Sequence, residues 1–311
     1  MRLTDTIWRI SILMLLLPSF IHSQSWWKTF GILSLPTSGL LPAWWVSVMY
    51  FLPLPFTLIS LSLKAIDKDA IEAGAVFFSP GVALLRVVLP SVLPAILGGA
   101  LLVFLLSLAD YSIPSIFSLN VYSLDIFAQF SVSGSVADSF FYSLPLLMIA
   151  SVVVIVGLNL LQDLSLTTKG ETIRNHVTIV LPPSVSLLSG MGLVISLLCI
   201  LIPSSNLILG MFQSVNTVET IEMGLSELIN SLIISSGSLL ISLPLSLSIG
   251  MQMSNKKLSG LAYFVLILPL IMPASLIGIG LIGVFHSTYW YNSIVMPILA
   301  IAIRYTPVGA L

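Results

Sequence analysis

The sequence predicts an all-α integral membrane protein, a polytopic bundle of about eight transmembrane helices. Two observations predict this class. The 311 residues are 57% hydrophobic and only 7% charged, with a mean hydropathy of +1.12, whereas a soluble domain carries charge on about a quarter of its residues. Apolar runs also recur at the length of about 20 residues that crosses the hydrocarbon core of a bilayer. Membrane lipid is therefore expected to surround most of the chain.

Eight runs along the chain fit a membrane-crossing helix. They lie at about 8–25, 40–63, 90–109, 139–162, 186–208, 227–250, 261–284 and 291–311. Most contain proline, which membrane helices tolerate when neighbouring helices satisfy the freed carbonyl groups. Kinked helices of this kind suit a transport pathway better than an inert anchor. The first 25 residues also have the basic start and short apolar core of a signal peptide, an alternative that the internal repeat disfavours.

The distribution of positive charge predicts an amino terminus in the cytoplasm. With that orientation, nine of the eleven Lys and Arg residues flank the runs on the cytoplasmic side, Lys28 lies outside and Arg304 falls within the last run. Positive residues collect on the cytoplasmic side of membrane proteins. The expected outer segments are instead acidic: Asp110, Asp125, Asp138, Glu219, Glu222 and Glu227. We therefore expect a multi-pass protein of a prokaryotic inner membrane.

The composition also excludes several function classes. A formal net charge of -1 gives no basic field for nucleic acid. The single cysteine, Cys199, lies in an apolar run, and the three histidines form no cluster for a metal; we expect His22, His176 and His286 to be interfacial or solvated. No GxxxxGK[ST] loop is present to hold ATP phosphates. Neither catalytic residues, a metal nor a cofactor is expected in this chain.

Two proline-containing segments occur twice. "LMLLLPSFI" (13–21) resembles "LPLIMPASL" (268–276), and "VMYFLPLPFTL" (48–58) resembles "AIRYTPVGAL" (302–311). These pairs match Pro18 with Pro273 and Pro53 with Pro307, at an offset of about 254 residues. We interpret them as a tandem duplication, which is common in transporters.

The duplication predicts the domain organisation. Residues 1–165 hold the later part of a first half, 166–185 a cytoplasmic linker, and 186–311 the early part of a second half. The counterpart of the 67–90 segment would fall after Leu311. We therefore expect the chain to be part of a longer two-copy protein.

The segment 67–90, "DKDAIEAGAVFFSPGVALLRVVLP", is unusually polar for this chain. We expect two short cytoplasmic helices, the first capped by Asp67 and the second begun by Ser79 and Pro80. Helical spacing gives the first helix a face that permits close approach, made of Ala70, Ala73, Gly74 and Phe77. This face would contact a partner or, alternatively, pack against the protein's own membrane helices.

This segment resembles the EAA loop of permease subunits of binding-protein-dependent ABC importers. Glu72, Ala73, Leu89 and Pro90 match the pattern, Gly74 takes its second alanine position and Phe78 its usual glycine position. The resemblance implies a MetI-like permease fold. It also implies that the loop forms a coupling helix, which docks in a groove of a cytoplasmic ABC ATPase dimer with the glutamate and the small face at the contact.

Three further segments extend the resemblance. "SLADYSIPSIF" (107–117), "YSLDIFAQF" (122–130) and "NSLIISSGSLLISLPLS" (230–246) look like fused two-half permeases for ferric iron and thiamine uptake. The implied function is passage of a small solute, ferric iron, thiamine or similar, delivered by an extracytoplasmic solute-binding protein and driven by ATP bound to the partner ATPase. The alternative is a secondary carrier or channel with a regulatory loop.

Four other residues are candidates for the translocation path. Asp110, Tyr111 and Pro114 follow the 90–109 run, and they line the path or contact the binding protein, or else form an ordinary polar helix end. Arg304 is the one charge deep within a run. It is either a pathway residue or the partner of a group in a missing segment.

Overall fold

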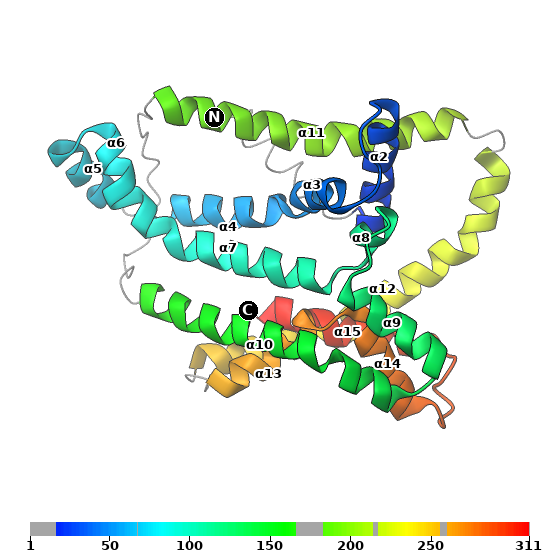
Figure 1. The fold of residues 1–311 in the computed structure, drawn as a ribbon. Coiled ribbons are helices and arrows are strands. Elements are labelled where there is room, and N and C mark those ends of the chain that lie inside the picture. Colours follow the sequence, from blue (N-terminus) through cyan, green and yellow to red (C-terminus); the bar gives the residue numbers. More distant parts are fainter. Residues whose placement is uncertain (1–16, 67, 166–182, 214–216, 256–259, 311) are drawn as a thin grey trace. The chain divides into compact units, whose positions relative to one another are not determined.

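The structure is a computed structural model that describes residues 17–66, 68–165, 183–213, 217–255 and 260–310 (Figure 1). Within these ranges the chain consists of helices and connecting turns, without a strand. The prediction of an all-helical protein is confirmed. The chain divides into two compact units: unit 1 (Met1–Ser107, Ser112–Leu119, Ile155–Leu209) and unit 2 (Leu108–Tyr111, Asn120–Val154, Gly210–Leu311).

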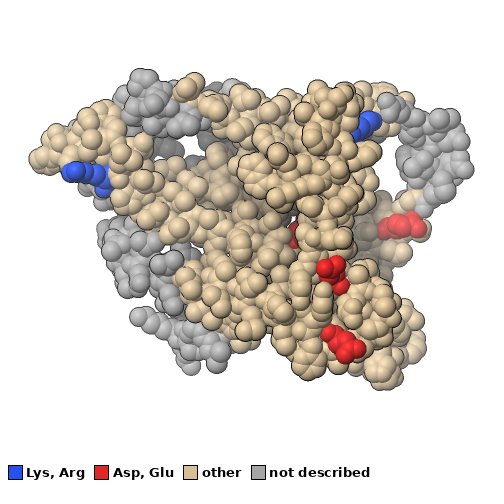
Figure 2. All heavy atoms as spheres, viewed as in Figure 1, with Lys and Arg blue, Asp and Glu red and all other residues tan. Residues whose placement is uncertain are grey.

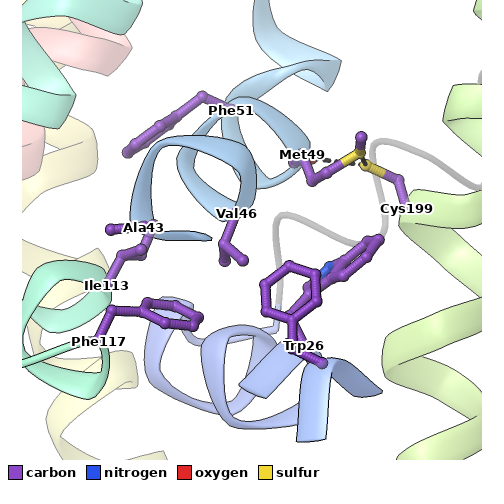
Figure 3. Close-up of a cluster of buried hydrophobic side chains, with 9 residues drawn as sticks. Trp26, Ala43, Val46, Met49, Phe51, Ile113, Phe117 and Cys199 are labelled. Atoms are coloured by element: carbon purple, nitrogen blue, oxygen red, sulfur yellow. Dashed lines mark hydrogen bonds between the residues drawn. The ribbon is translucent and has the colours of Figure 1, made fainter. Parts of the chain in front are cut away.

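Unit 1 is built around one apolar cluster. Its helices are α2 (Ser19–Ile32), α3 (Leu40–Phe51), α4 (Pro53–Lys64), α5 (Lys68–Phe77), α6 (Pro80–Ala83), the π-helix η1 (Leu84–Val88), most of α7 (Leu89–Ala109), α8 (Ser112–Ile116) and most of α11 (Pro183–Gln213). Side chains of α2, α3, α8 and α11 meet in the cluster (Figure 3), whose buried members are Trp26, Phe30, Ala43, Val46, Met49, Phe51, Ile113, Phe117 and Cys199.

Prolines and glycines set the helix geometry of unit 1. Pro53 starts α4 immediately after α3, and η1 lies just before Pro90. Because proline has no N–H, the carbonyl four residues before it loses its helical partner. Helices α4 and α7 approach closely, since a Cβ at Gly99 would lie 2.9 Å from Pro55 Cβ.

In unit 2, two long-range hydrogen bonds hold a pair of parallel helices together. Unit 2 contains α9 (Tyr122–Ser133), most of α10 (Val136–Ser165), α12 (Thr217–Asn255), α13 (Gly260–Ile271), α14 (Ala274–Phe285) and α15 (Val295–Ala310). Ser238 Oγ donates to Ile298 O at 3.0 Å, and Ser246 Oγ donates to Thr306 O at 2.8 Å. Both bonds join residues 60 positions apart, so α12 and α15 run in the same direction. A second apolar cluster, Ile126, Leu146, Leu276 and Ile279, joins α9, α10 and α14.

Five helices in the described ranges are long and apolar enough to cross a membrane: Leu40–Leu63, Pro80–Ala109, Val136–Gly157, Gly190–Gly210 and Gly224–Gln252. They overlap five of the eight predicted runs, although the second begins at Pro80, within the segment predicted to be a cytoplasmic loop. The run at 261–284 is instead a bent pair, and the run at 291–311 gives only the shorter helix α15. The run at 8–25 lies mostly outside the described residues. A membrane protein with several crossing helices is thus supported, while the number eight stays a prediction.

The bent pair in unit 2 has a proline at its break. Helices α13 and α14 meet at 104°, and Pro273, just before α14, has φ -52° and ψ 140°. This extended conformation ends the helical path. Pro18, its predicted counterpart, precedes α2 with φ -55° and ψ 139°. The match is what a duplication predicts for this pair. Pro53 and Pro307 differ, because Pro53 begins a helix and Pro307 lies inside one.

The compact units do not follow the two halves predicted from the repeat. Most of α11, from the predicted second half, belongs to unit 1, and α9 with most of α10, from the predicted first half, belongs to unit 2. The halves are defined by sequence similarity and the units by spatial proximity. The two-half organisation therefore stays a prediction.

Candidate functional site at residues 68 to 90

The segment predicted to be a coupling loop is a hairpin of short helices in unit 1. It comprises α5, α6 and η1, which contact one another before α7 begins. The first predicted short helix is present as α5, whereas the second is not short, because α6, η1 and α7 form one continuous helix from Pro80 to Ala109. The predicted cap Asp67 lies outside the described residues. Ser79 is the N-cap residue of α6 and Pro80 its first residue, as predicted, but the Ser79 hydroxyl makes no capping bond.

The turn of the hairpin forms without glycine. Phe78, at the position where the family pattern has glycine, donates its N–H to Gly74 O at 2.9 Å. Ser79 then has φ -62° and ψ 156°, and neither residue has positive φ. Because only positive φ strongly favours glycine, a phenylalanine is accommodated here without backbone strain.

Phe78 also fixes the second arm of the hairpin. The Arg86 guanidinium carbon lies 5.5 Å from the centre of the Phe78 ring, a distance at which the cation is attracted to the ring face. Arg86 belongs to η1. The aromatic residue that departs from the family pattern therefore links the turn to the following helix.

Part of the predicted contact face of α5 is buried within the hairpin, and part of it is exposed. Gly74 is buried, and a Cβ added to it would lie 2.9 Å from Val87 Cγ2, so Gly74 permits close packing within the hairpin. The placement of Gly74 on an outward contact face is therefore wrong, because α5 packs that side against η1. The Ala70 side chain lies outside the described residues.

The outward face of α5 consists of Glu72, Ala73, Val76 and Phe77. All four are exposed, and Val76 and Phe77 each expose 79% of their surface. Sequence reasoning missed Val76, although its helical spacing of four from Glu72 was a usable signal. Leu89 and Pro90 are exposed at the start of α7. The hairpin thus presents an acidic and apolar surface. Figure 2 shows that charged side chains are sparse among the described residues on the visible face of the molecule.

Three other candidates lie where α7 ends and α8 begins. The Asp110 carbonyl accepts a hydrogen bond from Ser123 Oγ at 3.2 Å, which ties the end of α7 to α9. Tyr111 is half-buried. Pro114 lies in α8, where its carbonyl accepts from the N–H groups of Phe117 and Leu119 at 3.1 and 3.0 Å. Asp110 and Tyr111 belong to unit 2 and Pro114 to unit 1.

Arg304 lies on α15 in unit 2 and is half-buried. Its guanidinium carbon is 6.0 Å from the centre of the neighbouring Tyr305 ring. Buried ionisable groups in membrane helices commonly mark a pathway.

One histidine expectation is corrected. His22 is buried, with 1% of its surface exposed, and its ring packs 5.4 Å from that of Tyr50. It is therefore not solvated, because α2 contributes this face to the interior of unit 1. His286 is exposed, as expected, and His176 lies outside the described residues. No group of three or more His, Cys, Asp or Glu that could hold a metal occurs in the part of the chain that the structure describes.

Comparison with protein-family models, with curated protein sequences and with solved structures found no match for this chain.

Proposed function

We propose that the chain is the transmembrane permease component of an ATP-driven ABC importer of the MetI-like, fused two-half type. It resides in a prokaryotic inner membrane with its amino terminus in the cytoplasm, and it passes a small solute delivered by an extracytoplasmic binding protein. A cytoplasmic ATPase dimer binds ATP and supplies the energy, so the permease itself is not an enzyme. Ferric iron and thiamine are the solutes that the resemblance suggests.

The observation that carries the proposal is the outward face of the α5 hairpin. A chain with 7% charged residues presents Glu72 beside two apolar side chains, Val76 and Phe77, each 79% exposed. Positive charge near the 67–90 segment predicts that this face lies in the cytoplasm, where lipid does not cover it. Exposed aromatic residues at the centre of such a patch are typical anchors of protein interfaces.

The geometry of the hairpin favours docking of a rigid element. The Gly74–Val87 contact and the stacking of Arg86 on Phe78 hold α5 against η1. A preorganised element loses less entropy on binding than a flexible loop does. Helix η1 leads directly into α7, so a displacement of the hairpin would be transmitted to α7, a candidate membrane-spanning helix.

The test is co-purification of the tagged chain with its cellular ATPase. We expect Phe77→Glu to lower ATPase recovery about tenfold or more, because it places a charge at the centre of the contact. Tyr289→Glu is the matched control, since Tyr289 is 95% exposed and lies outside the hairpin. Equal ATPase recovery with both variants would contradict the proposed docking surface. Absence of any ATPase from all preparations would instead favour the secondary carrier or channel.

A further inference from the structure

The loop that joins α14 to α15 exposes three consecutive aromatic side chains. It comprises residues 286–294 of unit 2, and Tyr289, Trp290 and Tyr291 expose 95%, 51% and 39% of their surfaces. Its sequence, "HSTYWYNSI", contains no Lys, Arg, Asp or Glu. Loops that project into water are normally rich in charged and small polar residues, whereas a group of exposed rings marks a surface that contacts a partner or a membrane.

The loop holds these rings in a fixed geometry, because successive turns close it. The N–H groups of Thr288, Tyr291 and Ser293 each donate to the carbonyl three residues earlier, at 2.9, 3.2 and 3.2 Å. Asn292 has a φ of 63°, a conformation that asparagine adopts more readily than most residues. A surface that is already ordered loses little entropy when it makes a contact.

The loop also satisfies polar groups of its own backbone. The hydroxyl of Thr288 donates to Phe285 O at 2.7 Å, and that of Ser293 donates to Trp290 O at 2.6 Å. The first N–H of α15, that of Val295, donates in turn to Ser293 Oγ at 3.3 Å. Backbone groups near lipid must find partners within the protein, because acyl chains offer none. The loop is therefore suited to surroundings that are poor in water.

The pairing of α15 with α12 gives the depth of the loop in a membrane. The two helices run in the same direction and are joined by the bond from Ser238 to Ile298, so Val295 lies at about the level of Ser235. The apolar segment of α12 that is long enough to cross a membrane begins at Gly224. At about 1.5 Å per residue, Gly224 lies no more than about 16 Å further along the helix. The loop therefore starts within the apolar stretch of α12 and not beyond it.

The composition of α12 places the boundary of the hydrocarbon core in the same stretch. Between Gly224 and Ser235 the helix exposes apolar side chains suited to lipid: Leu225, Leu228, Ile229 and Leu232. Glu227 is also exposed there, and a carboxylate is costly within the hydrocarbon core. The surface of the core is thus expected between Glu227 and Ser235, which is the level of the aromatic loop.

We propose that Tyr289, Trp290 and Tyr291 anchor the start of α15 at the boundary between the lipid headgroups and the acyl chains. Tyrosine and tryptophan favour this layer, because their rings are apolar while the phenol hydroxyl and the indole N–H bond to headgroups and water. The anchor fixes the depth of α15, the helix that carries Arg304. The inference requires a membrane protein but not the permease function.

The test is the depth of a nitroxide spin label on Tyr289→Cys, in the full chain in lipid nanodiscs with Cys199→Ser as background. Power saturation compares the collisions of the label with oxygen, which concentrates among acyl chains, and with a water-soluble nickel chelate. Leu240→Cys is the lipid reference, because Leu240 is 77% exposed within the apolar segment of α12. Glu72→Cys, on the outward face of α5, is the water reference. We expect the oxygen-to-nickel ratio at Tyr289→Cys to lie between the two references.

Replacing both Trp290 and Tyr291 by alanine should shift the label on Tyr289→Cys toward water and lower this ratio. Tyr305→Ala is the matched control, because Tyr305 is 53% exposed on α15 outside the loop, and it should leave the ratio unchanged. A ratio equal to that at Glu72→Cys, or no shift in the double alanine variant, overturns the proposal. Few collisions with either reagent would overturn it in favour of a protein partner that covers the loop. The measurement needs no ATPase, so its result is separate from the co-purification that tests the permease class.

Discussion

The Cys199 thiol donates a hydrogen bond to the carbonyl oxygen of Met49, with Sγ and O 2.7 Å apart (Figure 3). Pro53 stands four residues after Met49 and has no N–H, so it leaves this carbonyl without its helical partner. The thiol supplies the missing donor from α11, and Sγ also lies 3.5 Å from Met49 Sδ. The sequence suggests only a packing role for Cys199. In the structure its thiol supplies the hydrogen bond that Pro53 removes from a carbonyl group of another helix.

The first prediction concerns this bond. Cys199→Ala should destabilise the protein by about 1–2 kcal/mol, because it leaves a buried carbonyl unpaired, and Cys199→Ser should cost less, because it keeps a donor. In a Pro53→Ala background, residue 53 regains an N–H for Met49 O. Cys199→Ala should then cost less than it does in the native sequence. Thermal unfolding of the four combinations in one detergent measures the coupling; equal costs in both backgrounds would contradict the assignment of the thiol.

The second prediction concerns the contact of α12 with α15. A Cβ at Gly309 would lie 2.8 Å from Ser246 Oγ, so Gly309→Ala should overpack the contact and cost about 1–3 kcal/mol. Ser246→Gly removes both clashing atoms, the hydroxyl and the Cβ at 2.9 Å, and the double variant should be less destabilised than the sum of the two single variants. Gly278→Ala is the control, because nothing lies within 4 Å of its added methyl group. Additive losses in unfolding temperature would show that the two residues do not share this contact.

Hydrophobic run lengths and helix signals in the sequence located much of this fold. They identified five helices long and apolar enough to cross a membrane, and the short helix α5 with the new helix start at Ser79 and Pro80, because hydrophobic run length, proline and capping residues act locally. They also paired Pro18 with Pro273, which proved to have nearly the same backbone conformation. The resemblance to a permease loop drew attention to the segment whose exposed face carries the proposed function.

Other features depend on contacts that periodicity does not encode. The spacing of Gly74 with Ala73 gave one helical face, yet only packing against Val87 decides that Gly74 turns inward. The 104° bend at Pro273 could not be predicted from a continuous apolar run. His22 looked interfacial because the sequence does not show that Tyr50 covers it.

The third prediction concerns pH. Tyr122 donates its hydroxyl to Tyr142 O at 2.5 Å, and the two rings stack 5.0 Å apart. Burial, and then the neighbouring Tyr142 and Asp125, raise the pKa of Tyr122 above its ordinary value of 10.0. A raised pKa favours the protonated phenol in the folded state, so its contribution to stability is complete below about pH 10 and is lost as the pH rises through the folded-state pKa.

Tyr122→Phe lacks this titration and, at neutral pH, also lacks one hydrogen bond, worth about 1 kcal/mol. The difference in unfolding temperature between the native protein and Tyr122→Phe should therefore shrink above about pH 10. Tyr289→Phe controls for general alkaline effects, because Tyr289 is 95% exposed. A difference that stays constant between about pH 8 and about pH 11 would contradict the raised pKa.

The fourth prediction concerns which residues share a side of the membrane. Because α12 and α15 run in the same direction, we expect the bent pair α13 and α14 between them to cross the membrane once. The loop that carries Tyr289 should then lie on the side where α12 begins, near Glu227. The charge distribution assigns that side to the exterior and Glu72 to the cytoplasm. In intact cells with a Cys199→Ser background, a membrane-impermeant thiol reagent should label Tyr289→Cys and Glu227→Cys but spare Glu72→Cys until the cells are opened. Labelling of Glu72→Cys from outside would contradict the predicted orientation and, with it, the proposed ATPase contact. If only one of Tyr289→Cys and Glu227→Cys were labelled from outside, the bent pair would be a re-entrant loop.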